Sequence, residues 1–474
     1  MFVGTDPKGA VIYGIMAATI EEVIFMVIHP SDNVEVRADG HKYARRAIAA
    51  GENIIKYGMP IGHATRVIAP GERVHVDNVK TNLGEVLEYR YEPSFTDVAR
   101  RPAPTIRAYR HPDGRIGIRN DLWVIPLVGC VNRLAERLAA SCGGLALTHP
   151  YGCSQMGEDH ERTANMLAQF CHHPNAGGVL VVALGCENNT LESFKVRLGD
   201  YSRLNIRFLR AQDPGDEYAK GLALLKELEA ARPKERVEVP ASELVVGLKC
   251  GGSDGFSGLT ANPLVGRFSD WLAARGGSTI LTEVPEMFGA ETLLMKRCRT
   301  RDVFDKCVRM INDFKDYYAS HHQVCYENPS PGNKAGGITT LEDKSLGCVQ
   351  KGGSAPVEDV LLYGESVKRH GLSLLTGPGN DLVASTVLAA AGCHLILFTT
   401  GRGTPFGCVV PTLKVATNDT LAANKPNWID WNAMANPDVE AFAQKVLAVA
   451  SGEKAKNEQN GAQGIAIFKD GVTL

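Results

Sequence analysis

The chain has 474 residues, of which 44% are hydrophobic and 22% charged, the proportions of an ordinary folded protein. Its 51 lysines and arginines nearly balance its 53 aspartates and glutamates, which gives a formal net charge of -2. No overall charge therefore attracts nucleic acid or an anionic membrane surface. A chain of this length exceeds the size at which one hydrophobic core keeps growing, which predicts two or three domains.

The N-terminal stretch from Val11 to Ile28 is apolar but carries Glu21 and Glu22 near its centre, which argues against a membrane span. It also lacks the basic start and the small-residue cleavage site of a signal peptide. Residues 1–28 are interpreted as an N-terminal extension, and a cytoplasmic location is expected. The twelve cysteines are expected to be reduced thiols, some of them near ligands or metals, rather than a disulfide framework.

Residues 29–95 form a predicted β-rich module, because short β-prone runs are broken by glycine and proline, as from Gly51 to Val76. His63 belongs to this module. One interpretation is a lid that contributes a histidine or a lysine to a site, and the alternative is a packing or surface role. The proline-containing stretch from Glu92 to Ala108 is a predicted linker.

From Leu122 onward, apolar runs alternate with amphipathic stretches, as in GGVLVVALGC from Gly177 to Cys186. This pattern is typical of buried parallel strands with crossover helices. It predicts two α/β domains with mainly parallel sheets, residues 105–235 and residues 242–474, behind the small β-rich module. The fold class is therefore α/β, and ligands are expected at the carboxyl ends of the strands.

Three cysteines, Cys153, Cys186 and Cys250, each follow an apolar run at the start of a tight turn. Thiolates at neighbouring strand ends can converge on an iron ion. The alternative for any one of them is that a small buried cysteine simply fits where a strand enters a turn.

Polar residues accompany these turns and are candidates for the same site. His149 and His160 flank the Cys153 turn and can act as metal ligands or proton carriers, although a surface role is the alternative. Gln155 and Asp254 follow Cys153 and Cys250 closely and can orient substrate oxygens.

Two glycine-rich runs supply backbone N–H donors: GPGND, which contains Asn380, and TTGRGTPFG, which contains Arg402. Arginine pairs with a carboxylate through two hydrogen bonds, and a helix start favours an anion. Neither run matches a dinucleotide or P-loop fingerprint. Tight-turn geometry alone is the alternative explanation.

The stretch from Tyr326 to Cys348 is long, polar and without periodicity, and it contains Lys334. A long loop within a compact domain is uncommon unless it is functional. The alternative is a solvated crossover connection.

Together these motifs resemble the altronate/galactarate dehydratase family, from about His29 to Leu474. The resemblance is carried by HPSDN, IKYGMPIGHAT, YGCSQ, HPNAGGVLVVALGCENN, CGGSDGFSGLTANPLVGRFSDW, LTEVPEMFGAE, YENPSPGNKAGGITTLEDKSLGC, GPGNDLVAST and TTGRGTPFG. It implies an N-terminal SAF (antifreeze-like) module, two α/β domains, and dependence on iron(II) or manganese(II). It also implies conversion of D-altronate to 2-dehydro-3-deoxy-D-gluconate in hexuronate catabolism. Only VEVRAD separates HPSDN from GHK, which predicts a shortened SAF module.

Such a reaction needs a metal to stabilise an enediolate, a base to remove the proton and an acid to assist the departing hydroxide. The candidate metal ligands are Cys153, Cys186, Cys250 and His149, for iron alone or in an iron–sulfur cluster. The candidates for proton transfer are Lys249, His63 and His160. The candidates for substrate binding are Gln155, Asp254, Asn380, Arg402 and Lys334.

The predicted partner is a small-molecule sugar acid, with no nucleic acid and no membrane, and self-association into a homo-oligomer stays open. Family lyases that act on galactarate or sulfolactate are alternatives. A carbohydrate-binding protein without catalytic activity is a second alternative, although it accounts poorly for the polar glycine-rich turns of the later domains.

Overall fold

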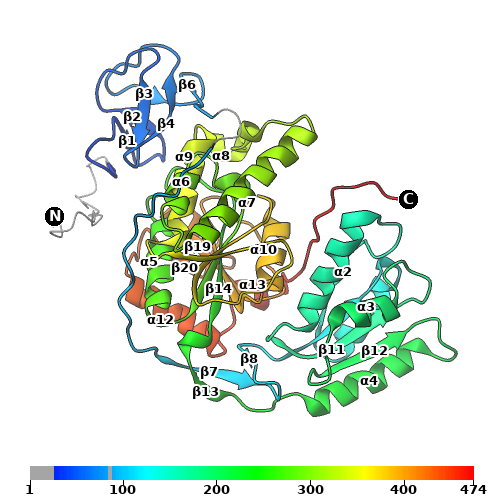
Figure 1. Ribbon diagram of the computed structural model, residues 1–474. Helices are drawn as coiled ribbons and strands as arrows, with labels where there is room; N and C mark the ends of the chain where they lie inside the picture. Colours follow the sequence, from blue (N-terminus) through cyan, green and yellow to red (C-terminus); the bar gives the residue numbers. More distant parts are fainter. Residues whose placement is uncertain (1–25, 84–87) are drawn as a thin grey trace.

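The computed structural model describes residues 26–83 and 88–474 (Figure 1). Most of the predicted N-terminal extension, residues 1–25, lies outside the described residues. The described chain forms a small β module followed by two larger α/β units, which confirms the predicted fold class.

The N-terminal module consists of two small antiparallel sheets, with strand orders β1-β2-β5 and β3-β4-β6. The strands are β1 (Val34–Val36), β2 (Lys42–Ala44), β3 (Asn53–Lys56), β4 (Met59–Ala64), β5 (Arg73–Val74) and β6 (Val79–Lys80). A bridge between Ile48 and Ile68 links the segments that lead into the turns at Gly51 and Gly71. Both isoleucines are fully buried, in a hydrophobic cluster that continues into the C-terminal domain.

After residue 88 the chain runs along the C-terminal domain, where the Tyr91 hydroxyl donates to the carbonyls of Cys298 and Arg299. It then enters a small antiparallel sheet of order β13-β7-β8. Its strands are β7 (Thr105–Arg110), β8 (Ile116–Gly117) and β13 (Val237–Pro240). Because β7 precedes the second domain and β13 follows it, this sheet ties the entry of that domain to its exit.

The second domain has a parallel sheet of order β10-β9-β11-β12 with helices on both faces. Its strands are β9 (Asp121–Pro126), β10 (Leu145–Ala146), β11 (Ala176–Ala183) and β12 (Ile206–Arg210). Its helices are η1 (Gly129–Val131), α1 (Asn132–Ser141), α2 (Gly157–Cys171), α3 (Leu191–Leu198) and α4 (Glu217–Ala231). Every residue of β11 is buried, which is why its sequence is a continuous apolar run.

The C-terminal domain has a seven-stranded parallel sheet of order β16-β17-β15-β14-β18-β19-β20. Its strands are β14 (Val245–Cys250), β15 (Ser278–Leu281), β16 (Val357–Leu361), β17 (Gly371–Leu375), β18 (Leu395–Thr400), β19 (Thr412–Ala416) and β20 (Trp431–Asn432). The central strand β14 directs its carboxyl end into the crevice where such sheets bind ligands.

Helices cover both faces of this sheet and its carboxyl edge (Figure 1). The α-helices are α5 (Ala261–Ala274), α6 (Glu291–Met295), α7 (Arg301–Ser320), α8 (Pro331–Ala335), α9 (Leu341–Cys348), α10 (Asp381–Ala390), α11 (Asp419–Asn424), α12 (Val439–Ala450) and α13 (Lys456–Gln459). Short 3-10 turns are η2 (Ala241–Glu243), η3 (Val284–Glu286), η4 (Cys325–Glu327) and η5 (Val349–Gly352). Within the described residues, no helix is both long and apolar enough to cross a membrane.

The polar stretch from Tyr326 to Cys348, which shows no hydrophobic periodicity in the sequence, carries α8 and α9. It also holds the N-terminal module in place. Asp343 on α9 accepts hydrogen bonds from Lys42 (2.7 Å) and Lys56 (2.9 Å), and all three side chains are buried. Burial disfavours a charge on Asp343, yet the two ammonium groups lower the pKa of its carboxyl below the ordinary value. Burial lowers the pKa of Lys42 to about 8.

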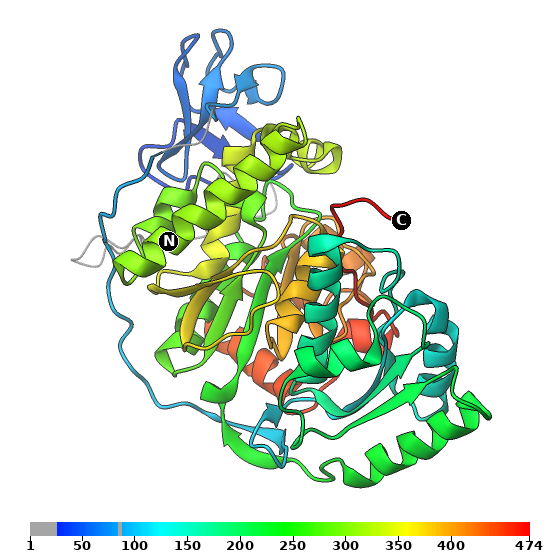
Figure 2. The same ribbon diagram turned by 45° about the vertical axis from the view of Figure 1, so that its right-hand side comes forward.

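The C-terminal tail returns to the second domain, as Figure 2 shows. Thr473 forms a β-bridge with Gln155, and the Leu474 N–H donates to the Ser154 carbonyl. The buried Asp159 carboxylate at the start of α2 accepts the N–H groups of Asp470 and Gly471. The tail therefore connects the C-terminal domain with the loops of the second domain.

Candidate active site

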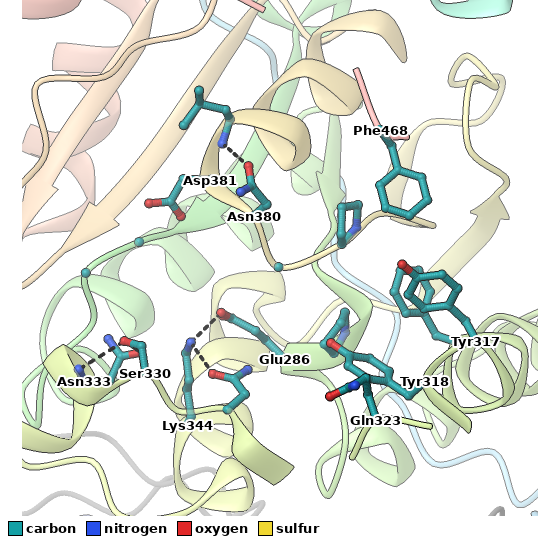
Figure 3. A pocket seen from close by; sticks show the side chains of 18 of the residues that line it. Glu286, Tyr317, Tyr318, Gln323, Ser330, Asn333, Lys344, Asn380, Asp381 and Phe468 are labelled. Atoms are coloured by element: carbon teal, nitrogen blue, oxygen red, sulfur yellow. Dashed lines mark hydrogen bonds and ion pairs between the residues drawn. The ribbon is translucent and has the colours of Figure 1, made fainter. Parts of the chain in front are cut away.

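A cavity of about 810 Å³ opens at the carboxyl end of the seven-stranded sheet (Figure 3). Its wall combines aromatic rings with amides, one ammonium group and two carboxylates. It is lined by Gly251, Gly252, Pro285, Glu286, Phe314, Tyr317, Tyr318, His321, Gln323, Asn328, Ser330, Asn333, Lys344, Pro378, Gly379, Asn380, Asp381, Leu382 and Phe468. Many amide donors and acceptors suit a polyhydroxylated molecule of modest size, and Lys344 is the cation of this wall.

A group of three buried ligands borders this cavity: Cys250, Glu286 and Cys348, whose ligand atoms all lie within 4.8 Å of one another. Glu286 Oε2 is 3.1 Å from Cys250 Sγ and 3.0 Å from Cys348 Sγ, and the two sulfurs are 3.2 Å apart. Cys250 ends β14, Glu286 ends η3 and Cys348 ends α9. The group can hold a metal ion, with two sulfur donors and one oxygen donor.

Three lysines surround the buried acidic groups. Lys351 Nζ lies 3.0 Å from Cys250 Sγ, and Lys344 Nζ lies 2.7 Å from Glu286 Oε1. A hydrogen bond from the Cys348 thiol lowers the pKa of Cys250 and raises that of Cys348. Burial disfavours a charge on Glu286, but the ammonium groups of Lys344 and Lys351 lower its pKa. These lowered pKa values of Cys250 and Glu286 favour the deprotonated forms that metal ligands need.

Lys249, the third lysine, is fully buried beside this group. Its Nζ donates to Glu283 Oε1 (2.6 Å) and to Asp381 Oδ1 (2.9 Å). Burial opposes the charge of Lys249, but Glu283 and Asp381 raise its pKa above the ordinary value, so it remains an ammonium. Asp381 is 34% exposed and faces the cavity, which gives Lys249 an indirect connection to a bound molecule.

Glu283 has an unusual backbone conformation, with φ of 73° in the left-handed region. There its carboxylate accepts from both Lys249 Nζ and the Cys250 N–H (3.1 Å). Strained backbone of this kind is found at ligand sites, where the surroundings hold it in place. The hydrogen bonds of Glu283, which precedes η3, hold the end of β14 beside η3.

Three of the residues predicted from the sequence meet here. Asn380 lines the cavity, Cys250 belongs to the buried ligand group, and Lys249 lies beside that group. Asn380 lies in the cavity wall and caps α10, since its Oδ1 accepts the N–H groups of Leu382 and Val383.

Arg402 and Asp254 line a neighbouring cavity of about 400 Å³. Arg402 donates to the Gly332 carbonyl at 3.3 Å. Asp254 accepts from the side chains of Thr417 and Asn418, and burial raises its pKa. Lys334 lies on α8, outside the described lining of both cavities.

The candidates from the second domain lie on a different sheet from Cys250. Cys153 and Cys186 are exposed and follow β10 and β11, and neither joins the buried ligand group. His149 is buried, donates from Nε2 to the Pro126 carbonyl and accepts the Tyr151 N–H at Nδ1. Both of its ring nitrogens are thus occupied, and burial lowers its pKa to about 4.

The last three candidates also lie outside the cavity lining. His160 is half-buried on α2, where its buried Nδ1 has no hydrogen-bond partner, and Gln155 contacts the C-terminal tail. His63 on β4 pairs with Asn82 Oδ1 at 2.7 Å. All twelve cysteines are free, in agreement with the expectation of reduced thiols.

Sequence reasoning did not single out Glu283, Glu286, Cys348 or Lys351. Each has a local signal in the sequence: the two glutamates flank VP in TEVPEMFG, and Cys348 closes the polar stretch just before Lys351. Nothing in the sequence alone connects these residues, because they are separated from Cys250 by 33 to 101 positions.

The fold and site define a three-part α/β enzyme with a polar cavity above a buried thiol–carboxylate group. The chain belongs to the altronate/galactarate dehydratase family. It matches the Altronate/galactarate dehydratase SAF domain over residues 35–82, the D-galactarate dehydratase/Altronate hydrolase second domain over 108–232, and the D-galactarate/Altronate dehydratase C-terminal domain over 241–473.

Curated relatives cover most of the chain. It is 54% identical to an altronate dehydratase of Bacillus subtilis (93% of this chain, 94% of the relative) and 51% identical to one of Escherichia coli (92% of each). It is 32% identical to a galactarate dehydratase (L-threo-forming) of Escherichia coli, over 89% of this chain and 87% of the relative.

Proposed function

We propose that this chain is a hydro-lyase that dehydrates D-altronate to 2-dehydro-3-deoxy-D-gluconate in hexuronate catabolism. The observation that carries the proposal is the polar cavity above Cys250, Glu286 and Cys348, in a chain more than half identical to two altronate dehydratases. The proposed setting is the cytoplasm, with a small sugar acid as the partner.

The proposed cofactor is iron(II) or manganese(II), held by Cys250, Glu286 and Cys348. The donor set fits a single ion, since two sulfur atoms and one carboxylate oxygen lie within 4.8 Å of one another. Two sulfur donors favour iron over manganese. When bound, the ion supplies Lewis-acid stabilisation of the charge that develops on the substrate carboxylate.

The chain's own residues supply binding and proton transfer. Lys344 Nζ, which pairs with Glu286 in the cavity wall, is assigned to the substrate carboxylate, and the amides of Asn328, Asn333 and Asn380 are assigned to its hydroxyl groups. The half-buried Asp381 carboxylate is assigned to take the proton next to the substrate carboxylate. The buried Lys249 ammonium donates to Asp381 at 2.9 Å and orients this carboxylate toward the cavity.

Turnover of purified protein tests this function under anaerobic conditions. Altronate, galactonate, galactarate and sulfolactate are each offered with iron(II), manganese(II) or a chelator, and 2-keto-3-deoxy acid or sulfite is detected. Metal-dependent keto-acid formation that is fastest with altronate supports the proposal. Faster turnover of another acid, sulfite release from sulfolactate, or no turnover with any metal would overturn it.

A further inference from the structure

The second domain carries three Gly–Cys turns at one edge of its sheet. Cys130 follows β9, Cys153 follows β10 and Cys186 follows β11, and each cysteine comes directly after a glycine. The three strands are adjacent and parallel, so their carboxyl ends meet at the same edge. All three thiols are free and exposed, although most other cysteines of the chain are buried.

Backbone hydrogen bonds fasten the three turns to one another. Gly129 in the first turn donates its N–H to the Tyr151 carbonyl (2.9 Å), next to the middle turn. Asn189, just after the third turn, donates to the Gly152 carbonyl (3.0 Å). The Cys153 turn is therefore held between the turns that carry Cys130 and Cys186.

The middle turn fits only because glycine precedes Cys153. Gly152 has φ of +98°, and a Cβ at this position would lie 1.9 Å from the Leu127 carbonyl. A side chain would thus push the Cys153 turn away from the end of β9 and from the Cys130 turn. Glycine at position 152 therefore lets the backbone of the Cys153 turn pack closely against the end of β9.

A buried polar group beside the turns lacks a partner. Gln155 is only 5% exposed, and its Oε1 accepts the Gly152 N–H at 3.2 Å. Its Nε2 has no hydrogen-bond partner. A buried donor without a partner is uncommon in folded proteins and points to a bound ligand. Gln212 Nε2 lies 3.4 Å from Cys186 Sγ, a second amide at the same edge.

We propose that Cys130, Cys153 and Cys186 bind an iron–sulfur cluster. Three thiols lose their protons and bind iron as thiolates, and the free amide donors suit hydrogen bonds to sulfur. Among the described residues, the one set of three ligand atoms within 4.8 Å of one another is Cys250, Glu286 and Cys348. The three exposed thiols therefore do not all lie as close together as the ligand atoms of that group, and the adjacent parallel strand ends bring their turns to one edge of the sheet.

This site is separate from the group that is proposed to hold the single ion. The C-terminal tail runs from the main cavity to this second site. Phe468 lines the cavity, and Thr473 forms a β-bridge with Gln155 beside the cysteine turns. A cubane with three cysteine ligands has one iron without a thiolate, which is open to an oxygen ligand. The inference does not depend on the proposed reaction.

Anaerobic reconstitution of the full chain with iron(II), sulfide and a thiol reductant tests the site. The readouts are acid-labile sulfide per chain, visible absorbance, and electron paramagnetic resonance after reduction. Cys130→Ser, Cys153→Ser and Cys186→Ser are each expected to lose most of the sulfide and the spectral signals. Cys142→Ser, an exposed cysteine at the end of α1 in the same domain, serves as the matched control and is expected to retain them.

Cys348→Ser separates this site from the buried ligand group and is expected to keep the cluster signals while losing single-ion binding. Circular dichroism shows whether each variant is folded. Three outcomes would overturn the proposal: no acid-labile sulfide in folded wild-type protein, zinc or iron bound without sulfide, or cluster signals that survive all three serine substitutions.

Discussion

Lys351 Nζ lies 3.0 Å from Cys250 Sγ, and both side chains are buried beneath the main cavity. An ammonium buried without a counter-charge is costly, so this contact stabilises the thiolate form of Cys250. Glu286 and Cys348 meet the same sulfur. Together these side chains bring two sulfur atoms and one carboxylate oxygen within 4.8 Å of one another, with an ammonium group beside them.

Serine substitution at Cys348 is expected to lower bound iron(II) or manganese(II) at least about tenfold, because a hydroxyl is a much poorer ligand than a thiolate. Metal content after dialysis, measured by elemental analysis, checks this. Cys393→Ser is the matched control, since Cys393 is equally buried but packs in the hydrophobic core. Equal metal content in the two variants would remove Cys348 from the ligand set.

Asp381→Asn is expected to reduce kcat by about 10²- to 10⁴-fold, the usual effect of removing a proton-transfer group. KM should change little if Asp381 acts mainly in the proton transfer step. Steady-state kinetics with altronate measure both quantities. Asp419→Asn, at the start of α11 and outside the main cavity lining, is the control. A kcat close to wild type in Asp381→Asn would contradict the assigned role.

Asp343→Asn is expected to destabilise the attachment of the N-terminal module. The change leaves the ammonium groups of Lys42 and Lys56 buried without a carboxylate, and breaking a buried pair of this kind costs about 3–5 kcal/mol. Urea unfolding measures the loss. Glu52→Gln removes an exposed pair with Arg46 in the same module and should change the midpoint very little. Similar midpoints for the two variants would contradict this prediction.

Lys42 predicts a pH effect of defined sign. Its pKa is lowered in the folded state to about 8 from 10.5, so between these values the unfolded chain binds more protons. Stability therefore rises with pH through this window, by up to about 1.4 kcal/mol per pH unit from this group. The difference in unfolding free energy between wild type and Lys42→Met, followed from pH 8 to pH 10, isolates the effect. A difference that does not change across the window would show that Lys42 titrates normally.

Much of the fold was predictable because local pattern determines it. The run that forms β11 is apolar throughout, and a strand buried on both faces requires that pattern. The glycine turn at Asn380 and Asp381 predicted a helix start, and α10 begins there. The lysine and cysteine at the end of β14 were recognisable for the same reason, since strand ends in such sheets hold ligands.

The sequence by itself determined the α/β class, the β-rich module, the family resemblance and the strand ends that carry cysteine. Only the tertiary structure decided which of these ends meet. Cys250 lies on the seven-stranded sheet and meets Cys348, 98 positions away, whereas Cys153 and Cys186 belong to the separate four-stranded sheet. The physical reason is that local hydrophobic periodicity specifies a strand and its buried faces, but strand order and the helices that close over a sheet depend on long-range packing.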